Sequence, residues 1–164
     1  MLTLDSDWLD EFERADIEPV YLVQIYTTTG DPLAFCTGNR ILEFAGIYNE
    51  FTGGTSAAIT AYPSVAAVTP LTIDLDPFER TINRNSATIS FHDDGPIRDF
   101  IASTRLLNRN VSIKLGTANL TTELDWAPVF RGIISKIEPR EGVIDIECRD
   151  FFHYTEKPYY GNWV

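Results

Sequence analysis

Apolar and polar residues alternate along residues 108–150 in the manner of β-strands. In residues 143–148 successive side chains point to opposite faces, so one face is expected to be buried and the other to lie in water. Residues 129–138 alternate in the same way, and the turn segment 139–142 lies between the two runs. The pattern predicts a β-hairpin, preceded by a short strand at 111–115. The side chains expected on the buried face of its second strand are Ile144, Ile146 and Cys148.

Other segments rich in β-branched and aromatic residues predict further strands. These segments are residues 20–27, 33–37, 40–48, 71–75 and 87–91. Gly46 is expected to bend or interrupt the third of them, and Gly132 in the hairpin indicates a bulge or a close backbone approach. Residues 49–56 are polar and rich in small side chains, which predicts a loop. Residues 57–67 are ambiguous, with Ile59 and Tyr62 as the side chains able to anchor them to a core.

Two segments carry helical patterns. Residues 96–108 begin with Pro96, which is tolerated in a first helical turn, and continue with an apolar stripe formed by Ile97, Phe100, Ile101 and Leu107. Near the N-terminus, acidic residues beginning with Asp5 predict a short capped helix. Its Trp8 and Phe12 would share one face, packed either on the domain or against another subunit.

The predicted fold is therefore mostly β, a barrel or sandwich of about nine strands with a helix near 96–108 packed on the sheet. We expect an N-terminal helical arm at 1–19, a β domain at 20–156 and an aromatic C-terminal tail at 157–164. That tail contains Tyr159, Tyr160, Trp163 and Val164, and aromatic residues at this density are typical of a contact surface. The tail is expected to be either an interface, a link to further sequence, or a segment docked on its own domain.

Composition narrows the functional classes. The chain is 44% hydrophobic and has no apolar run of the length that a membrane helix needs. Its net charge is −11, and residues 1–80 hold 13 acidic and 3 basic side chains. Such a surface repels a phosphate backbone, so sequence-specific nucleic-acid binding is not expected. The first residues lack the pattern of a secretory signal, so synthesis in the cytoplasm is expected.

Candidate chemistry is sparse. His92, Asp93 and Asp94 form the one cluster that resembles a hydrolase or metal site, but Asp residues before Gly95 and Pro96 are also typical helix caps, and we favour the cap. Cys36 and Cys148 lie in strand patterns without metal-ligand spacing, which favours two buried thiols, with a disulfide between them left open. We therefore expect no catalytic residue, no metal site and no cofactor.

A resemblance to a known family rests on the order of several strand motifs. The chain resembles the N-terminal region of the tail-tip and baseplate hub proteins of tailed phages and of phage-like gene transfer agents. The motifs lie within residues 21–25, 41–48, 87–93, 110–116, 128–134 and 142–150. Some relatives of this class hold an iron–sulfur cluster on several cysteines, whereas this chain has two cysteines.

The resemblance implies an architectural role without catalysis. Copies would assemble around the tail axis of a virion and connect the tail tube to distal tail, tape measure, hub or fibre proteins, while DNA passes through the lumen. An acidic lumen wall would let DNA slide without sticking. The interface candidates are Trp8, Phe12, Tyr159, Tyr160, Trp163 and Val164.

Two other functions remain as alternatives. A carbohydrate-binding β module would use Trp126, Tyr62 or the terminal aromatic residues as a sugar platform. A small hydrolase would use His92 with Asp93 or Asp94.

Overall fold

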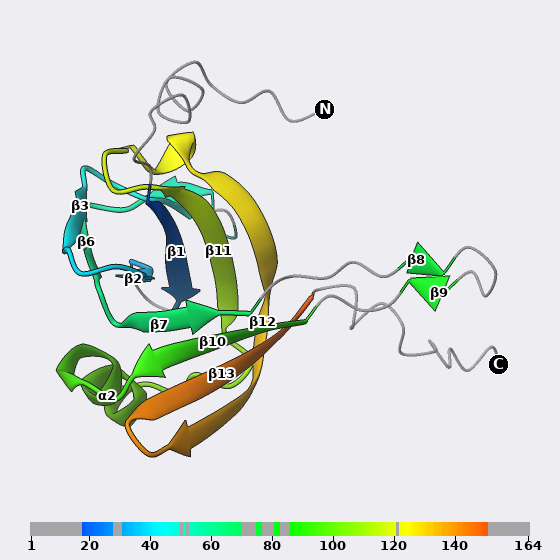
Figure 1. The fold of residues 1–164 in the computed structure, drawn as a ribbon. Helices are drawn as coiled ribbons and strands as arrows, with labels where there is room; N and C mark the ends of the chain where they lie inside the picture. The colour runs from blue at the N-terminus through cyan, green and yellow to red at the C-terminus, as the bar shows by residue number, and fades with distance from the viewer. Residues whose placement is uncertain are drawn as a thin grey trace, which may run out of the picture.

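Nine strands form one mixed sheet in the computed structural model, which describes residues 18–27, 31–49, 51, 53–69, 75–76, 81–82, 86–120 and 122–150 (Figure 1). The strand order is β3-β6-β2-β1-β11-β12-β13-β10-β7. Strands β2 and β6 are parallel, and the other neighbouring pairs are antiparallel. The strands are β1 (Pro19–Tyr26), β2 (Leu33–Cys36), β3 (Leu42–Phe44), β6 (Ile59–Tyr62), β7 (Val65–Val68), β10 (Ser86–His92), β11 (Asn110–Thr117), β12 (Ala127–Arg140) and β13 (Val143–Asp150).

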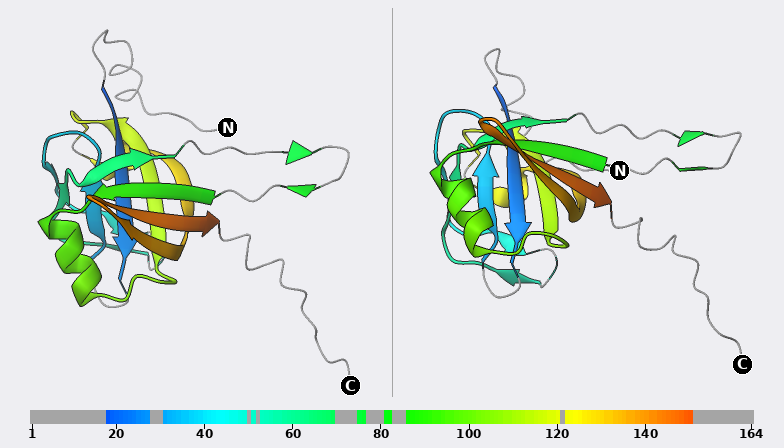
Figure 2. Two further views of the ribbon diagram at one scale, coloured as in Figure 1. Left: turned by 60° about the horizontal axis from the view of Figure 1, so that its bottom comes forward. Right: turned by 90° about the horizontal axis from the view of Figure 1, so that it is seen from below.

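The sheet curls over on itself, so that β7, β10 and β13 cross in front of β1 and β11 (Figures 1 and 2). The main core lies between these two layers and receives side chains from both ends of the strand order, including Phe35 of β2 and Phe91 of β10. Their rings meet edge to face at a centroid distance of 5.3 Å. The predicted β-rich class is confirmed. The form is a sandwich-like open sheet with β3 and β7 at its edges rather than a closed barrel.

Helix α2 (Gly95–Ser103) covers one end of this core with Ile97 and Phe100. The helix was expected to continue to residue 108, but the backbone becomes extended at Thr104. Leu106 is then buried, while Leu107, predicted on the apolar stripe, is 43% exposed. Asn108 adopts a positive φ of 65° and turns the chain into β11, where its N–H donates to the Ile134 carbonyl at 2.9 Å. This turn replaces the last predicted helical turn.

A second core covers the other face of β1, β2 and β11. Leu22, Phe44 and Trp126 belong to it, and Trp126 lies over Gly116 of β11, where a Cβ atom would stand 2.5 Å from the indole ring. The chain before Trp126 forms a short 3-10 helix, η1 (Glu123–Asp125). The central strands are thus buried on both faces, which explains why residues 20–27 are apolar at nearly every position.

Gly46 interrupts the third predicted strand, as expected, since β3 ends at Phe44. Glycine is needed at this position because a Cβ atom there would lie 2.7 Å from the Ser56 carbonyl oxygen. The segment that follows differs from the predicted loop at 49–56. Strands β4 (Tyr48–Asn49) and β5 (Gly54–Thr55) pair with each other as a small antiparallel hairpin. Another two-stranded pair, β8 (Leu75–Asp76) and β9 (Thr81–Ile82), lies away from the nine-stranded sheet (Figure 1).

The hairpin of β12 and β13 confirms the main sequence prediction, with Ile144, Ile146 and Cys148 buried in the main core. The two-residue turn requires a positive φ of 75° at Gly142. Asp145 was expected on the solvent face but is only 8% exposed. Its carboxylate accepts a hydrogen bond from the Ser90 hydroxyl at 2.6 Å and forms an ion pair with the Arg140 guanidinium at 3.1 Å. These two partners compensate for the burial of the charge.

The predicted N-terminal helix and the aromatic tail at 157–164 lie outside the described residues, as does the expected boundary between residues 156 and 157. Most of the predicted strand at 71–75 also lies outside them.

The close approach at Gly132 generates the first prediction. A Cβ atom there would stand 2.2 Å from the backbone oxygen of Arg149, and a backbone oxygen inside a sheet cannot move cheaply. We expect Gly132→Ala to lower the free energy of unfolding by about 3 kcal/mol in urea denaturation. Gly54→Ala is the matched control, because no atom lies within 4 Å of its added methyl group. Equal stability of the two variants would contradict the register of β12 on β13.

Candidate functional site

Polar side chains gather beneath the second core, on the face that β1 and β11 turn toward η1. Gln24 and Ser112 are cross-strand partners, and Lys114 follows two positions along β11, so the alternation of the two strands places these side chains on one face. The face is closed to solvent, with Lys114 4% and Glu123 2% exposed. We call Gln24, Tyr26, Lys114 and Glu123 the buried polar cluster.

The Glu123 carboxylate is the centre of this cluster. Its Oε1 accepts from the Lys114 ammonium and from the Gln24 amide at 3.2 Å. Its Oε2 accepts the backbone N–H of Tyr48 at 3.3 Å. One carboxylate therefore joins η1, the sheet and strand β4.

Tyr26 extends the cluster toward the β4–β5 hairpin. Its hydroxyl donates to the Gln24 side-chain oxygen at 2.9 Å, and its ring meets Phe51 edge to face at a centroid distance of 4.7 Å. A buried charge is costly unless it is paired and fully hydrogen-bonded, and these contacts meet that condition for Glu123. The cluster is a structural clamp, since its side chains lie away from solvent.

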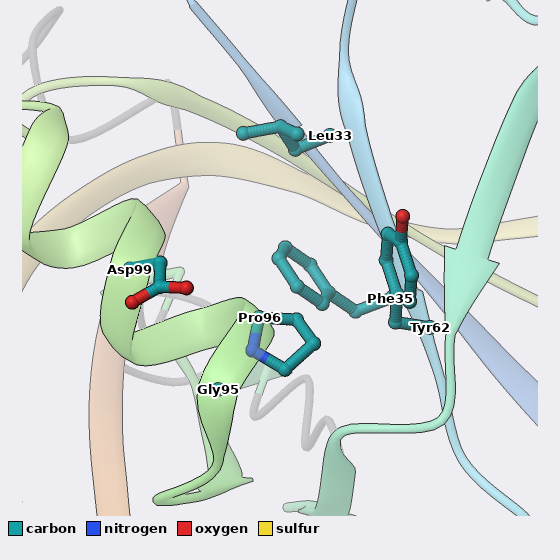
Figure 3. A pocket seen from close by; sticks show the side chains of 6 residues that line it. All are labelled: Leu33, Phe35, Tyr62, Gly95, Pro96 and Asp99. Carbon is teal, nitrogen blue, oxygen red and sulfur yellow. The ribbon is translucent and has the colours of Figure 1, made fainter.

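A shallow pocket of about 340 Å³ lies elsewhere, between β2, β6 and the start of α2 (Figure 3). Phe35 and Pro96 approach each other at its base, Tyr62 stands on the β6 side, and Asp99 projects from the helix. Leu33 and Gly95 complete the lining. Most of this lining is apolar, so the pocket suits an apolar or aromatic group better than an ion.

The hydrolase candidates His92, Asp93 and Asp94 serve the turn into α2. Asp93 receives two hydrogen bonds from the Arg98 guanidinium, at 3.0 and 2.7 Å, and these bonds lower the pKa of the Asp93 carboxyl. Asp94 occupies the N-cap position through its backbone, without a side-chain cap bond. The side chains of His92 and Asp94 are exposed and hydrogen-bond to no other described residue. The cap interpretation thus fits the backbone, while Asp93 acts as an ion-pair partner.

The two sugar-platform candidates within the described residues, Trp126 and Tyr62, do not form a common surface. Trp126 is 2% exposed, stacks on Gly116 and donates its indole N–H to the Leu120 carbonyl at 3.3 Å, so its ring cannot meet a ligand. Tyr62 is 39% exposed and lines the pocket. The prediction for Trp126 as a platform was therefore wrong, because the residue fills the second core.

Cys36 and Cys148 are both free and buried, and they belong to the cores on opposite faces of the sheet. Burial raises the pKa of the Cys36 thiol to about 11 and that of Cys148 to about 12. The disulfide left open by the sequence does not form in this structure.

Groups of three or more His, Cys, Asp or Glu side chains placed to hold a metal do not occur in the described part of the chain. The helical segments within those same ranges are all too short or too polar to cross a membrane. The interface candidates Trp8, Phe12, Tyr159, Tyr160, Trp163 and Val164 lie outside the described residues.

The buried polar cluster was missed by the sequence patterns. Gln24 and Lys114 stand in the middle of strands predicted to be buried, and a polar side chain at such a position requires a partner. That signal shows that a partner exists, but Glu123 is 99 residues from Gln24 in the sequence. Only the fold identifies it.

Removal of the Glu123 carboxylate tests the clamp. We expect Glu123→Ala to lower the free energy of unfolding by about 3–5 kcal/mol, because Lys114 would remain buried without its counter-charge. Lys114→Met combined with Glu123→Leu should cost clearly less than Glu123→Ala, since neither charge then remains. Urea denaturation measures both. The exposed pair of Lys136 and Glu138 supplies the control, and Glu138→Ala should change stability far less than Glu123→Ala, because solvent screens this exposed pair. A clamp is excluded if Glu123→Ala and Glu138→Ala have similar effects.

Thiol reactivity tests the placement of the cysteines. A neutral thiol is a poor nucleophile, so at pH 8 the folded protein should react with a disulfide reagent such as DTNB only very slowly. In concentrated urea both thiols should react rapidly. Rapid release of one equivalent from the folded protein would show that a cysteine is accessible, and release of none in urea would show a disulfide.

Comparison with known proteins gives a likeness of fold. No family model matches the sequence, and no curated protein matches it. Among solved structures, the chain is similar to a chain of the "Virion of native gene transfer agent (GTA) particle", with a TM-score of 0.58 and 13% sequence identity. The similarity covers 93% of this chain and 47% of that one, so this chain spans about half the length of its structural neighbour. At this identity the comparison establishes a shared fold.

Proposed function

We propose that the chain is a structural component of a phage-like virion, located at the tail tip or baseplate. The observation that carries this proposal is the fold shared with a chain of a gene transfer agent virion over 93% of the present sequence. The strand motifs of phage hub proteins found in the sequence fall on β1, β3, β10, β11, β12 and β13 of that fold. The two lines of support are separate, since one uses residue patterns and the other the path of the backbone.

In this role several copies surround the tail axis and join the tail tube to hub or receptor-binding proteins. The electrostatics are compatible with such a position, because residues 1–80 carry a net charge of −10 and an acidic wall does not retain DNA. The chemistry also favours architecture over catalysis. Asp93 is engaged by Arg98, Trp126 is inside the second core, and both thiols are buried and weakly acidic.

Purified particles test the proposal. Particles from a strain carrying an epitope-tagged copy of the gene should contain the protein in several copies, and antibody labelling in electron microscopy should mark one end of the tail. Deletion of the gene should leave capsids without functional tails, and the wild-type copy should restore them. A protein absent from purified particles, or one whose deletion leaves tails intact, would overturn the assignment.

A further inference from the structure

The pocket beside α2 lies at the point where the curled sheet leaves its seam open. Strand β6 is second from one edge and β7 forms the opposite edge, yet only Pro63 and Ser64 connect them in sequence. The two ends of the sheet are therefore close together here. The first turn of α2 and the side chains of Phe35 and Tyr62 line the hollow that remains. The pocket is thus a product of the fold and not of one loose loop.

An exposed apolar surface continues from the pocket. Tyr62 of β6 is the cross-strand neighbour of Phe35 of β2 in this parallel pair. On the other side, the antiparallel register of β3 on β6 places Leu42 opposite Ala61, and Ile41 immediately precedes β3. Ile41 is 58% exposed and Tyr62 39%, so both belong to the exposed large apolar side chains of the described residues. Aromatic side chains beside a pocket are typical anchors of protein contacts.

The charge around the pocket is negative. Asp99 lines it and forms no hydrogen bond or ion pair with another described residue, and the exposed Asp94 lies just before Gly95. Arg98 forms an ion pair with Asp93 and attracts Asp99 only at longer range, and Asp94 and Asp99 form no ion pair with a described residue. A matching occupant therefore carries an aromatic or proline side chain next to a cation.

Aromatic side chains outside the described residues lie in three segments, 1–17, 77–80 and 151–164, and the charges of these segments differ. Residues 77–80 hold one aromatic side chain and one acidic and one basic side chain, which cancel. Residues 1–17 hold six acidic side chains and one basic one, so Asp94 and Asp99 would repel them. Residues 157–164 hold Lys157 followed by Pro158, Tyr159 and Tyr160, and no acidic side chain. We infer that residues 157–164 of a neighbouring copy dock in this pocket, with Lys157 facing Asp99 and the aromatic residues covering Tyr62 and Pro96.

The length of the chain favours a neighbouring copy over the same copy. Val143 pairs with His92, close to the pocket, but β13 then runs seven residues away from it to Asp150, a distance of about 23 Å. The seven steps of the chain from Asp150 to Lys157 span roughly 24 Å at full extension. Docking in the pocket of the same copy would therefore require residues 151–156 to be completely extended. The pocket of a neighbouring copy is not tied to this distance.

Such a contact joins the tail of one copy to the pocket of the next. Head-to-tail contacts of this kind close into rings when the rotation between copies permits. The inference rests on the proposed function for its biological setting, because it supplies the contact by which copies surround a tail axis. Its physical content is a self-association that can be measured without virions.

Charge reversal on the full-length protein tests the contact. Asp99→Lys and Lys157→Glu should each raise the dissociation constant for self-association about tenfold or more, measured by sedimentation velocity and mass photometry. The variant with both changes should regain wild-type association, since the charges are again opposite. Tyr62→Ala and Trp163→Ala should weaken association to a similar extent through loss of the aromatic contact. Glu18→Lys is the control, because Glu18 is exposed at the start of β1 and does not line the pocket, and it should have no effect.

A mixture of the two single reversals identifies which copy supplies the tail. Each tail then meets a pocket of opposite charge in the other variant, so mixing should restore association. If each tail docks on its own copy, mixing restores nothing and the inference is overturned. A wild-type protein that stays monomeric, or single reversals with unchanged association, would overturn it as well. The protein content of purified virions is measured independently of self-association. If the wild-type protein is present in virions but the variants associate normally, the docking contact is wrong and the proposed function stands.

Discussion

The burial of one carboxylate holds three parts of the molecule together. Glu123 brings η1, the β1–β11 pair and strand β4 to a single point, and it does so away from water. A charge in such a place is tolerated only while all of its partners are present. The second core depends on this condition, because Phe44, Trp126 and Leu120 come from segments that Glu123 and its neighbours fix against the sheet. The polar cluster thus decides where the covering segments lie, and the apolar contacts supply most of the stabilisation.

Two cores on opposite faces of one sheet explain several features at once. The central strands carry apolar side chains on both faces, and glycine is required where another group approaches the sheet closely. Gly116 admits the indole of Trp126, and Gly132 admits the backbone of β13. The same packing removes Trp126 and both cysteines from any contact with solutes. On the surface of the described part of the chain, the pocket beside α2 lies next to the exposed Tyr62 and to the acidic side chains at the start of α2.

The sequence predicted the β-rich class, most of the long strands and the β12–β13 hairpin. Alternation of apolar and polar side chains over six or more residues indicates a strand with one buried face. The sequence located the close approach at Gly132 and the interruption at Gly46 for the same local reason. It failed where a contact between distant residues decides the outcome. Asp145 is buried by Ser90 and Arg140, α2 ends early because Asn108 turns toward Ile134, and Trp126 is covered through Gly116. None of these partners is marked by periodicity.

The position of the cysteines determines how the folded protein responds to oxidants. Cys36 and Cys148 lie in the cores on opposite faces of the sheet, where each thiol donates to a backbone carbonyl, so neither can reach the other and burial disfavours the loss of its proton. Oxidants therefore find no thiolate to attack while the fold persists. The fold therefore keeps these two thiols apart in reducing and in oxidising surroundings alike.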